Sequence, residues 1–417
     1  MKKVRIGVVG ARRGSSMINY CKKSDNSELV AICDNNPELL EEQKKNHAED
    51  NVAFYDSFDE FIKHDMDAVV LANFATDHAP FAIRAMNAGL HVFSEVLPVE
   101  TMKEAVELIE TVEKTGKIYA YGENYCFMPA PAEMKRLYRE GVIGEFEYGE
   151  GEYIHNCEPI WPEITYGVRD HWRNNMYSTF YCTHSLGPII HATGLRPVSV
   201  TGFESRMTER NLRDGAKGGQ FGIEMVTLEN GGIVKSIHGN LYKDSIWYTM
   251  YGGRGRVECA REDAQCDHVA RVYLNVDEES GKYDTGKLET YLPERPQDEL
   301  ARPFGHGSSD FYAMYNFVER ILGNEDADTI DVYEALDMFL PGMFAYRSVL
   351  AGGVPTEIPN LRSPEEREKW RSDTACVTPE KAGDMLLPTA VGGTPDIPDE
   401  VYREVEKKYL EKLENKE

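Results

Sequence analysis

Long apolar runs and closely spaced cysteines are both missing from this sequence of 417 residues. No apolar segment approaches the roughly 20 residues that a membrane helix needs, and the first residues lead into a strand without a signal-peptide segment. The 8 cysteines are scattered, with no Cys-x-x-Cys pair, which argues against a zinc ribbon or a disulfide framework. We therefore expect a cytoplasmic protein that does not enter membranes.

Basic residues are also scarce. Lys and Arg total 46 against 71 Asp and Glu, which gives a formal net charge of −25. Such a charge repels nucleic acid and anionic membrane surfaces, so we exclude both as partners and expect a small-molecule ligand. Hydrophobic residues make up 41% of the chain, enough for a packed core, and its length suits two domains.

The N-terminal part alternates short apolar runs with helical segments such as Pro37–Asn46 and Thr101–Lys114. Strands that read as continuously apolar and alternate with helices are typical of a parallel sheet covered on both faces. We therefore predict an α/β Rossmann domain with a doubly wound parallel sheet over residues 1–124. Its expected strands are Val4–Val9, Leu29–Cys33, Asp67–Ala72, His91–Phe93 and Ile118–Tyr121.

A different pattern follows. Helices are expected at Met134–Tyr138 and after Thr183, and the remaining runs are strands separated by turns, with a hairpin signal at Asn230–Gly232. This order predicts an α+β domain with an open, largely antiparallel sheet over 125–375, and a C-terminal extension, 376–417, that ends in a charged helix or a frayed tail. The expected strands are Glu145–His155, Val198–Glu204, Gly222–Glu229, Gly232–Asn240, Ser245–Tyr251 and Val269–Val276.

A turn containing two glycines closes the first strand, in the sequence Gly10-Ala11-Arg12-Arg13-Gly14-Ser15. Glycine lets the backbone approach a pyrophosphate, which then lies on the N-terminus of the following helix. The turn departs from Gly-x-Gly-x-x-Gly, because Arg12 and Ser15 hold the second and third glycine positions and Gly14 is displaced by one. We expect Gly10, Gly14 and Arg12 to bind the pyrophosphate; solvation is the alternative for both arginines.

Asp34 closes the second expected strand, where a carboxylate accepts hydrogen bonds from both ribose hydroxyls of a dinucleotide. The same carboxylate repels a 2′-phosphate, so Asp34 favours NAD over NADP. Capping of the helix before Pro37 is a second role for this side chain, and the two roles are compatible.

The block Asp67-Ala68-Val69-Val70-Leu71-Ala72-Asn73-Phe74-Ala75-Thr76-Asp77-His78, followed by Asn87-Ala88-Gly89 and His91-Val92-Phe93-Ser94-Glu95, resembles the glucose–fructose oxidoreductase (Gfo/Idh/MocA) superfamily. The resemblance implies that Asn73, His78, Glu95 and Asn124 line the nicotinamide half of the cofactor. It also implies a homo-oligomer, since the open sheet of this family usually pairs with another subunit.

One expected residue of that family is missing. The usual Glu-Lys-Pro is replaced by Glu95-Val96-Leu97-Pro98, and the lysine is the residue that, in ordinary family dehydrogenases, eases proton loss from the substrate hydroxyl. Valine cannot move a proton, so the usual acid–base group is absent.

A narrower group lacks the same lysine. The stretches His171-Trp172-Arg173 and Tyr181-Cys182-Thr183-His184-Ser185-Leu186-Gly187-Pro188 resemble the NAD-dependent α-N-acetylgalactosaminidases. Their Tyr-x-His-Asp corresponds here to Tyr153-Ile154-His155-Asn156, with Asn in place of Asp and a shorter interval to His184. His306-Gly307 with Asp310 resembles another of their recurring segments.

This second resemblance implies a glycosidase that holds NAD tightly as a catalytic cofactor. Oxidation at C3 acidifies the C2–H bond, the aglycone leaves, water adds, and re-reduction completes the hydrolysis without paired carboxylates. Tyr153 and His184 are the expected catalytic residues, one for the hydroxyl proton and one for the C2 proton, and the two roles can be exchanged. The expected substrate-binding residues are His155, Trp172, Arg173 and His306.

Three alternatives remain at this point. The protein could be an NAD-dependent sugar or cyclitol dehydrogenase in which His184 replaces the missing lysine, or a non-catalytic NAD-binding regulator. A divalent metal could bind His155, His171 and His184 together with Asp170. We predict no metal, because these residues lack the tight spacing of a ligand set.

Overall fold

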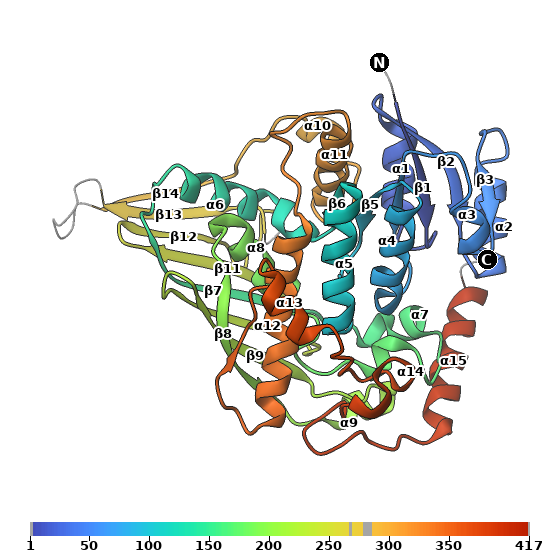
Figure 1. Cartoon of the computed structure of the whole chain (residues 1–417). Coiled ribbons are helices and arrows are strands. Elements are labelled where there is room, and N and C mark those ends of the chain that lie inside the picture. Colours follow the sequence, from blue (N-terminus) through green and yellow to red (C-terminus); the bar gives the residue numbers. More distant parts are fainter. Residues whose placement is uncertain (1–2, 267–268, 278–285, 416–417) are drawn as a thin grey trace. The chain divides into compact units, whose positions relative to one another are not determined.

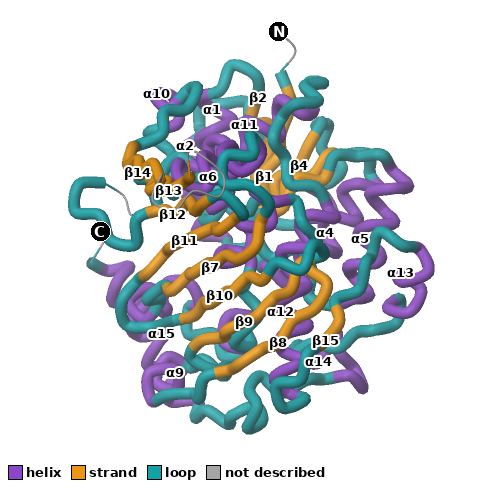
Figure 2. The backbone as a smooth tube through the Cα atoms, turned by 90° about the vertical axis from the view of Figure 1, so that its left-hand side faces the viewer, coloured by secondary structure: helices purple, strands orange, loops and turns teal. Residues whose placement is uncertain are grey.

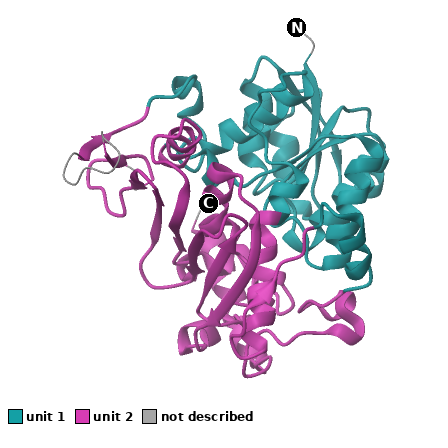
Figure 3. Cartoon of the chain, turned by 60° about the vertical axis from the view of Figure 1, so that its left-hand side comes forward, with its two compact units in different colours: residues 1–129, 294–336, 361–373 teal, residues 130–293, 337–360, 374–417 magenta. Residues whose placement is uncertain are grey.

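A computed structural model of the chain describes residues 3–266, 269–277 and 286–415, which fold into two compact units (Figure 3). Unit 1 comprises Met1–Pro129, Glu294–Leu336 and Leu361–Asp373. Unit 2 comprises Ala130–Pro293, Asp337–Asn360 and Thr374–Glu417. No described helix is long and apolar enough to cross a membrane.

Unit 1 contains a six-stranded parallel sheet in the order β3-β2-β1-β4-β5-β6 (Figure 1). The predicted doubly wound sheet is therefore confirmed. Strand order reverses between β1 and β4, and ligands of such sheets bind at the carboxyl ends of the strands beside that reversal. The strands are β1 (Val4–Val9), β2 (Ser27–Cys33), β3 (Ala53–Tyr55), β4 (Ala68–Leu71), β5 (His91–Ser94) and β6 (Tyr119–Tyr121).

The helices of unit 1 have clear local signals at their ends. In α5 the Thr101 side chain accepts a hydrogen bond from the Glu104 amide while the Glu104 carboxylate reaches back to the cap, and Gly116 ends the helix at φ +61°. The helices are α1 (Ser15–Lys23), α2 (Pro37–Asn46), α3 (Phe58–Phe61), α4 (His78–Asn87), α5 (Met102–Thr115), α10 (Asp298–Ala301), α11 (Ser309–Ile321) and α13 (Pro364–Trp370).

Unit 2 contains a nine-stranded sheet in the order β14-β13-β12-β11-β7-β10-β9-β8-β15 (Figure 2). Among the described strands of this sheet, only β7 and β10 pair in parallel, which confirms the expected largely antiparallel sheet. The strands are β7 (Phe146–Ile154), β8 (Pro197–Glu204), β9 (Phe221–Leu228), β10 (Ile233–Gly239), β11 (Ser245–Gly252), β12 (Gly255–Cys259), β13 (Val272–Asp277), β14 (Gly286–Tyr291) and β15 (Thr356–Glu357).

The predicted hairpin at Asn230–Gly232 connects β9 and β10 and is confirmed. Gly231 has φ +86°, a conformation that glycine adopts without strain, and the Asn230 side chain accepts the Gly232 amide at 2.9 Å.

The helices that belong to unit 2 are α6 (Pro129–Arg139), α7 (Trp161–Thr165), α8 (Thr183–Thr193), α9 (Glu209–Asp214), α14 (Pro379–Ala382) and α15 (Asp399–Glu414), and α12 (Val332–Leu350) begins in unit 1 and continues in unit 2. The C-terminal segment forms a helix rather than a frayed tail; residues 416–417 lie outside the described part. This helix contacts α7 and α9, and Arg169 binds Asp399 together with the Ile397 carbonyl.

Helix α8 lies directly against the sheet because β7 has no side chain at Gly151. A Cβ atom there would stand 1.7 Å from the Ser185 carbonyl oxygen. The Ser185 hydroxyl hydrogen-bonds the Ser236 hydroxyl of β10 at 2.8 Å, and Gly194 ends the helix at φ +68°. The first turn of α8, which carries His184, is thereby fixed to the sheet.

Replacing Gly151 should separate α8 from the sheet. We expect Gly151→Ala to lower the free energy of unfolding by about 3 kcal/mol, because the added methyl group meets backbone rather than a flexible side chain. Urea unfolding measures this loss. Gly392→Ala is the matched control, since nothing lies within 4 Å of a Cβ at Gly392, and equal stability of the two variants would contradict the close contact.

Candidate active site

The turn after β1 requires glycine at both predicted positions. Gly10 has φ +88°, and a Cβ there would lie 2.3 Å from the Ala72 carbonyl oxygen. At Gly14 a Cβ would lie 2.5 Å from the Gly10 carbonyl oxygen and 2.6 Å from a Val8 methyl group. The displaced glycine therefore allows the close packing of strand and helix that the third glycine usually allows.

Asp34 connects this turn to the end of β2. Its carboxylate accepts the Ala11 amide and the Asn36 amide, each at 2.8 Å, and the side chain is buried. Asp34 does not cap α2, contrary to the second role considered above. The cap is Asn36, which directly precedes the helix and whose side-chain oxygen accepts the amides of Glu38 and Leu39.

Asn73 and His78 lie beyond the end of β4. The His78 ring is buried, with Nδ1 2.9 Å from the Leu97 carbonyl oxygen and Nε2 3.3 Å from the Asn73 carbonyl oxygen. It therefore links the loop after β4 to the segment that replaces Glu-Lys-Pro. The buried Oδ1 of Asn73 has no hydrogen-bond partner within the described residues.

A charged cluster centres on Arg13, which the sequence left open between pyrophosphate binding and solvation. Its guanidinium makes two hydrogen bonds to Asp310, both 3.1 Å, and an ion pair with Glu95 at 2.6 Å. Asn124 donates to Asp310 at 3.1 Å, and His306 Nδ1 lies 3.1 Å from the same carboxylate. The side chains of Glu95 and Asp310 are only 5% and 2% exposed, so Arg13 compensates two buried charges.

The ionisation of Asp310 follows from this cluster. Burial alone would raise the pKa of its carboxyl, but the His306 hydrogen bond and the Arg13 charge hold that pKa well below its ordinary value. Asp310 is therefore a carboxylate that orients Arg13, Asn124 and His306.

These residues fit a dinucleotide. Two glycines leave the backbone open, the N-terminus of α1 follows directly, and Asp34 stands at the end of the neighbouring strand. Asn73 adds a buried oxygen that no other described residue hydrogen-bonds. Arg12 is exposed on the same turn. His306 and Asn124 both contact Asp310, so the structure brings them together in unit 1.

In unit 2 the rings of Tyr153 and His184 meet. Their centroids are 4.7 Å apart at 62°, an edge-to-face contact. Tyr153 lies near the end of β7, and the buried His184 lies in the first turn of α8. The Tyr248 hydroxyl donates to the His184 carbonyl oxygen, which holds this turn from the β11 side.

A series of rings continues from this pair. Adjacent rings are inclined by only 24° between Tyr153 and Tyr181, 16° between Tyr181 and Trp172, and 28° between Trp172 and His171. The Arg173 guanidinium lies 4.4 Å from the Trp172 ring centroid, a cation–π distance. Two of the predicted substrate residues, Trp172 and Arg173, thus adjoin the tyrosine rings that contact His184.

Two further histidines have structural contacts. Burial, together with the Arg173 charge, lowers the pKa of His171 to about 3, so its ring is neutral and accepts the Arg173 amide at 3.2 Å. His155 Nδ1 lies 3.1 Å from the Cys157 sulfur, and burial raises the pKa of that thiol to about 11. The thiol is therefore protonated at neutral pH and is a poor nucleophile.

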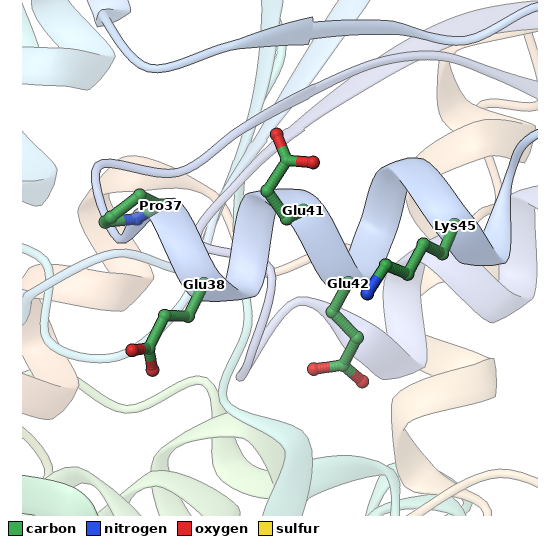
Figure 4. A pocket seen from close by; sticks show the side chains of 5 residues that line it. All are labelled: Pro37, Glu38, Glu41, Glu42 and Lys45. Atoms are coloured by element: carbon green, nitrogen blue, oxygen red, sulfur yellow. The ribbon is translucent and has the colours of Figure 1, made fainter.

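The described residues contain no group of three His, Cys, Asp or Glu side chains that could hold a metal ion. A hollow beside α2 is lined by Pro37, Glu38, Glu41, Glu42 and Lys45 (Figure 4). These side chains are exposed, and the three carboxylates would repel an anionic ligand. The hollow includes none of the predicted site residues.

Some contacts of the site were not evident from the sequence. The role of Arg13 as the partner of Glu95 and Asp310 was missed, as were the ring of Tyr181 and the Tyr248 hydrogen bond. Tyr181 could have been found, since it stands within the matched motif; the other contacts join positions that no local pattern connects.

Comparison with known proteins finds one matching family model for the N-terminal residues and relatives that match most of the chain. Residues 4–123 match the oxidoreductase family with an NAD-binding Rossmann fold. The chain is 25% identical over 408 residues to a glycosyl hydrolase family 109 protein of Solibacter usitatus, covering 88% of this chain and 90% of that protein.

Two solved structures share the fold. An oxidoreductase domain protein of Kribbella flavida superposes with a TM-score of 0.70 at 16% identity, covering 86% of this chain and 100% of that one. Scyllo-inositol dehydrogenase of Lactobacillus casei, with bound NAD(H) and scyllo-inositol, superposes with a TM-score of 0.65 at 19% identity, covering 87% and 100%.

Removing the cation of the charged cluster should destabilise unit 1. We expect Arg13→Met to lower the free energy of unfolding by about 3 kcal/mol at neutral pH, because two buried carboxylates lose their guanidinium. The loss should shrink as the pH falls below neutral, because without the guanidinium the buried Asp310 carboxyl is protonated more readily, whereas its lowered pKa keeps it ionised in the wild type. Chemical unfolding at several pH values measures it.

Arg12→Met is the control for that measurement. Arg12 is exposed, so its replacement should change the free energy of unfolding by no more than about 0.5 kcal/mol. Equal losses in both variants, or a loss independent of pH, would contradict the assignment of Arg13 to the buried pair.

Proposed function

We propose that this chain, whose residues 4–123 match the oxidoreductase family with an NAD-binding Rossmann fold, is a glycoside hydrolase that uses a nicotinamide dinucleotide. The proposed reaction is oxidation at C3, elimination of the aglycone, addition of water and re-reduction, with no net redox change. The relatives named glycosyl hydrolase family 109, which match almost the whole chain, support this over a net dehydrogenase reaction.

Unit 1 would hold the cofactor through the turn of Gly10 and Gly14, with Arg12 on the pyrophosphate and Asp34 on the ribose hydroxyls. When bound, the nicotinamide supplies a reversible hydride acceptor. Because Asp34 is a buried carboxylate at the end of β2, it would repel a 2′-phosphate, and we propose NAD rather than NADP.

Asn73, His78, Glu95 and Asn124 would orient the nicotinamide half. The contacts in unit 1 support rigid positions for three of them: His78 lies between two carbonyl oxygens, Glu95 binds Arg13, and Asn124 binds Asp310. Groups held in this way lose little entropy when a ligand binds.

Tyr153 and His184 would move the protons. One accepts the proton of the substrate hydroxyl as that carbon is oxidised, and the other removes the proton from C2 before the aglycone leaves. The edge-to-face contact at 4.7 Å places both groups beside one another, as two successive proton transfers on neighbouring carbons require. The contact is compatible with either residue accepting the hydroxyl proton while the other removes the C2 proton.

The aromatic surface next to this pair would bind the sugar. Trp172 offers an aromatic ring of the kind that stacks on the C–H face of a sugar, and polar groups come from Arg173 beside that ring and from His155 beside Tyr153. His306 is also proposed to contact the substrate; its side chain is 43% exposed, and Asp310 orients it from unit 1.

The observation that carries the proposal is the pairing of Tyr153 with His184 in a chain that has Val96 in place of the expected lysine. Val96 is buried and apolar, so unit 1 supplies no proton acceptor at that position. An enzyme that must remove two protons then needs both groups of unit 2.

Hydrolysis without net redox change can be measured directly. We expect purified enzyme with NAD to release nitrophenol from one member of a panel of nitrophenyl glycosides while no NADH accumulates. In D₂O the product should carry deuterium at C2, and replacing NAD by NADP should lower the rate. NADH that accumulates in proportion to free sugar, with no aglycone released, would identify a dehydrogenase instead.

The two proposed catalytic residues can be tested with the active glycoside. Tyr153→Phe and His184→Ala should each lower kcat by about 10²–10⁴-fold, the usual contribution of a positioned acid or base, while NAD affinity stays within about twofold. Tyr251→Phe, an exposed tyrosine of the same sheet, is the control and should retain wild-type kcat. Full activity of either first variant would contradict the assignment.

A further inference from the structure

Two buried titratable side chains lie on the α8-covered face of the unit 2 sheet and have no part in the reaction proposed above. Glu224 is on β9 and His238 on β10, and they are 0% and 2% exposed. The Glu224 Oε1 atom is 3.8 Å from the His238 Nδ1 atom. None of their four heteroatoms makes a well-formed hydrogen bond within the described residues, although Ser236 and the Ser178 carbonyl lie close enough to influence them.

This pair lies against the proposed catalytic residues. In the parallel pairing of β10 and β7, His238 is directly opposite Tyr153, and its ring interacts electrostatically with His184. Glu224 is opposite Ser236 in the β9–β10 pairing, and Ser236 hydrogen-bonds Ser185, the residue that follows His184. The pairing of β10 with β7 therefore connects the pair to Tyr153. Ser236 and Ser185 connect it to the turn that carries His184.

The surroundings of the pair favour a protonated Glu224 and a neutral His238 at neutral pH. Burial raises the pKa of Glu224 to about 8, with the nearby Ser236 hydroxyl opposing it. Burial lowers the pKa of His238 to about 3, with the Ser178 carbonyl opposing it and the nearby His184 adding to it. Protonated Glu224 beside a neutral imidazole carries no net charge, which avoids burying an ion.

We propose that Glu224 and His238 are positioning residues for Tyr153 and His184: they fix the first turn of α8 and keep the surface beneath the catalytic pair uncharged. This inference rests on the proposed function. An ionised Glu224 would place a negative charge beneath Tyr153 and oppose any phenolate there, so the active form would require the proton to remain on the pair.

The groups around the pair are few. Among the described residues, the titratable neighbours of the pair are His184 from α8 and Tyr153 from β7. The Ser236 hydroxyl of β10 is the polar neighbour of Glu224. On the other side β8 places Gly202 opposite Glu224, and a Cβ at Gly202 would meet the Ala345 carbonyl of α12 at 2.2 Å. Both of these neighbours are uncharged, so on this side the described residues add no charge to that of Glu224.

The experiment combines infrared spectroscopy with a pH–rate profile of the NAD-bound enzyme. We expect the wild type to show a protonated-carboxyl band at neutral pH that titrates near pH 8 and is missing in Glu224→Gln. With the active glycoside, kcat/KM of the wild type should fall about tenfold for each pH unit above that titration, whereas Glu224→Gln should retain its activity at pH 9.

Thermal unfolding supplies a readout that needs no substrate. The ordinary pKa of the carboxyl is 4.5 and the folded-state pKa is raised, so the contribution of Glu224 to stability is highest below pH 4.5 and is lost as the pH rises toward 8. Glu224→Gln does not ionise, so its Tm relative to the wild type should increase steadily between pH 5 and pH 9. His238→Gln tests the second residue and should lower kcat at every pH without changing NAD affinity.

Glu150→Gln is the matched control, a carboxyl of β7 that pairs with Lys235 on the opposite face of the sheet, and it should change neither the band nor the profile. No carboxyl band at neutral pH, or the same alkaline fall in Glu224→Gln as in the wild type, would overturn the proposal. Lack of any glycosidase activity alongside a band that titrates as expected would refute the proposed function and, with it, the positioning role, but would leave the protonated Glu224 established.

Discussion

The approach of α8 to the sheet at Gly151 is the constraint on which unit 2 depends. Because nothing larger than hydrogen fits between β7 and the Ser185 carbonyl, the helix starts directly on the sheet. At that contact His184 packs against Tyr153, and the Ser185 hydroxyl hydrogen-bonds Ser236. His238 lies opposite Tyr153 on the neighbouring strand. The proposed chemistry therefore depends on a position that contributes no functional group of its own.

In unit 1 the site residues are held in place by a charged cluster rather than by close backbone packing. Arg13 holds two carboxylates that come from distant parts of the chain, and Asn124 and His306 attach to one of them. A buried ionic cluster adds little net stability compared with apolar packing, but it fixes the directions of its hydrogen bonds. This suits a surface that must present polar groups to a dinucleotide in one arrangement.

Local signals made much of the fold predictable. Apolar runs between helices indicated the parallel sheet, and the Thr101 to Glu104 capping pair and the Asn230–Gly232 turn are signals carried by neighbouring residues. The cofactor turn was also readable, because Gly10 and Asp34 follow adjacent strands. The burial of Glu224 was not predictable, because a charged residue in an alternating strand is ordinarily expected to face solvent. Only its position two residues before the buried Val226, and therefore on the same face of β9, indicated the covered face. The partners of Arg13 could not be found, because Asp310 follows it by 297 positions and no periodicity spans that interval.

The same separation has a consequence for how the protein is made. The Rossmann strands leave the ribosome first, yet the carboxylate that completes their charged cluster arrives only with α11, after eight of the nine strands of the unit 2 sheet, β7 to β14, have been synthesised. Until then Arg13 and Asn124 lack their shared partner, and the last contacts of the first unit must close across a very long loop. The nucleotide-binding half of the chain would thus be the first to begin folding and among the last to finish, and a fragment ending at residue 129 would be missing part of its own interior.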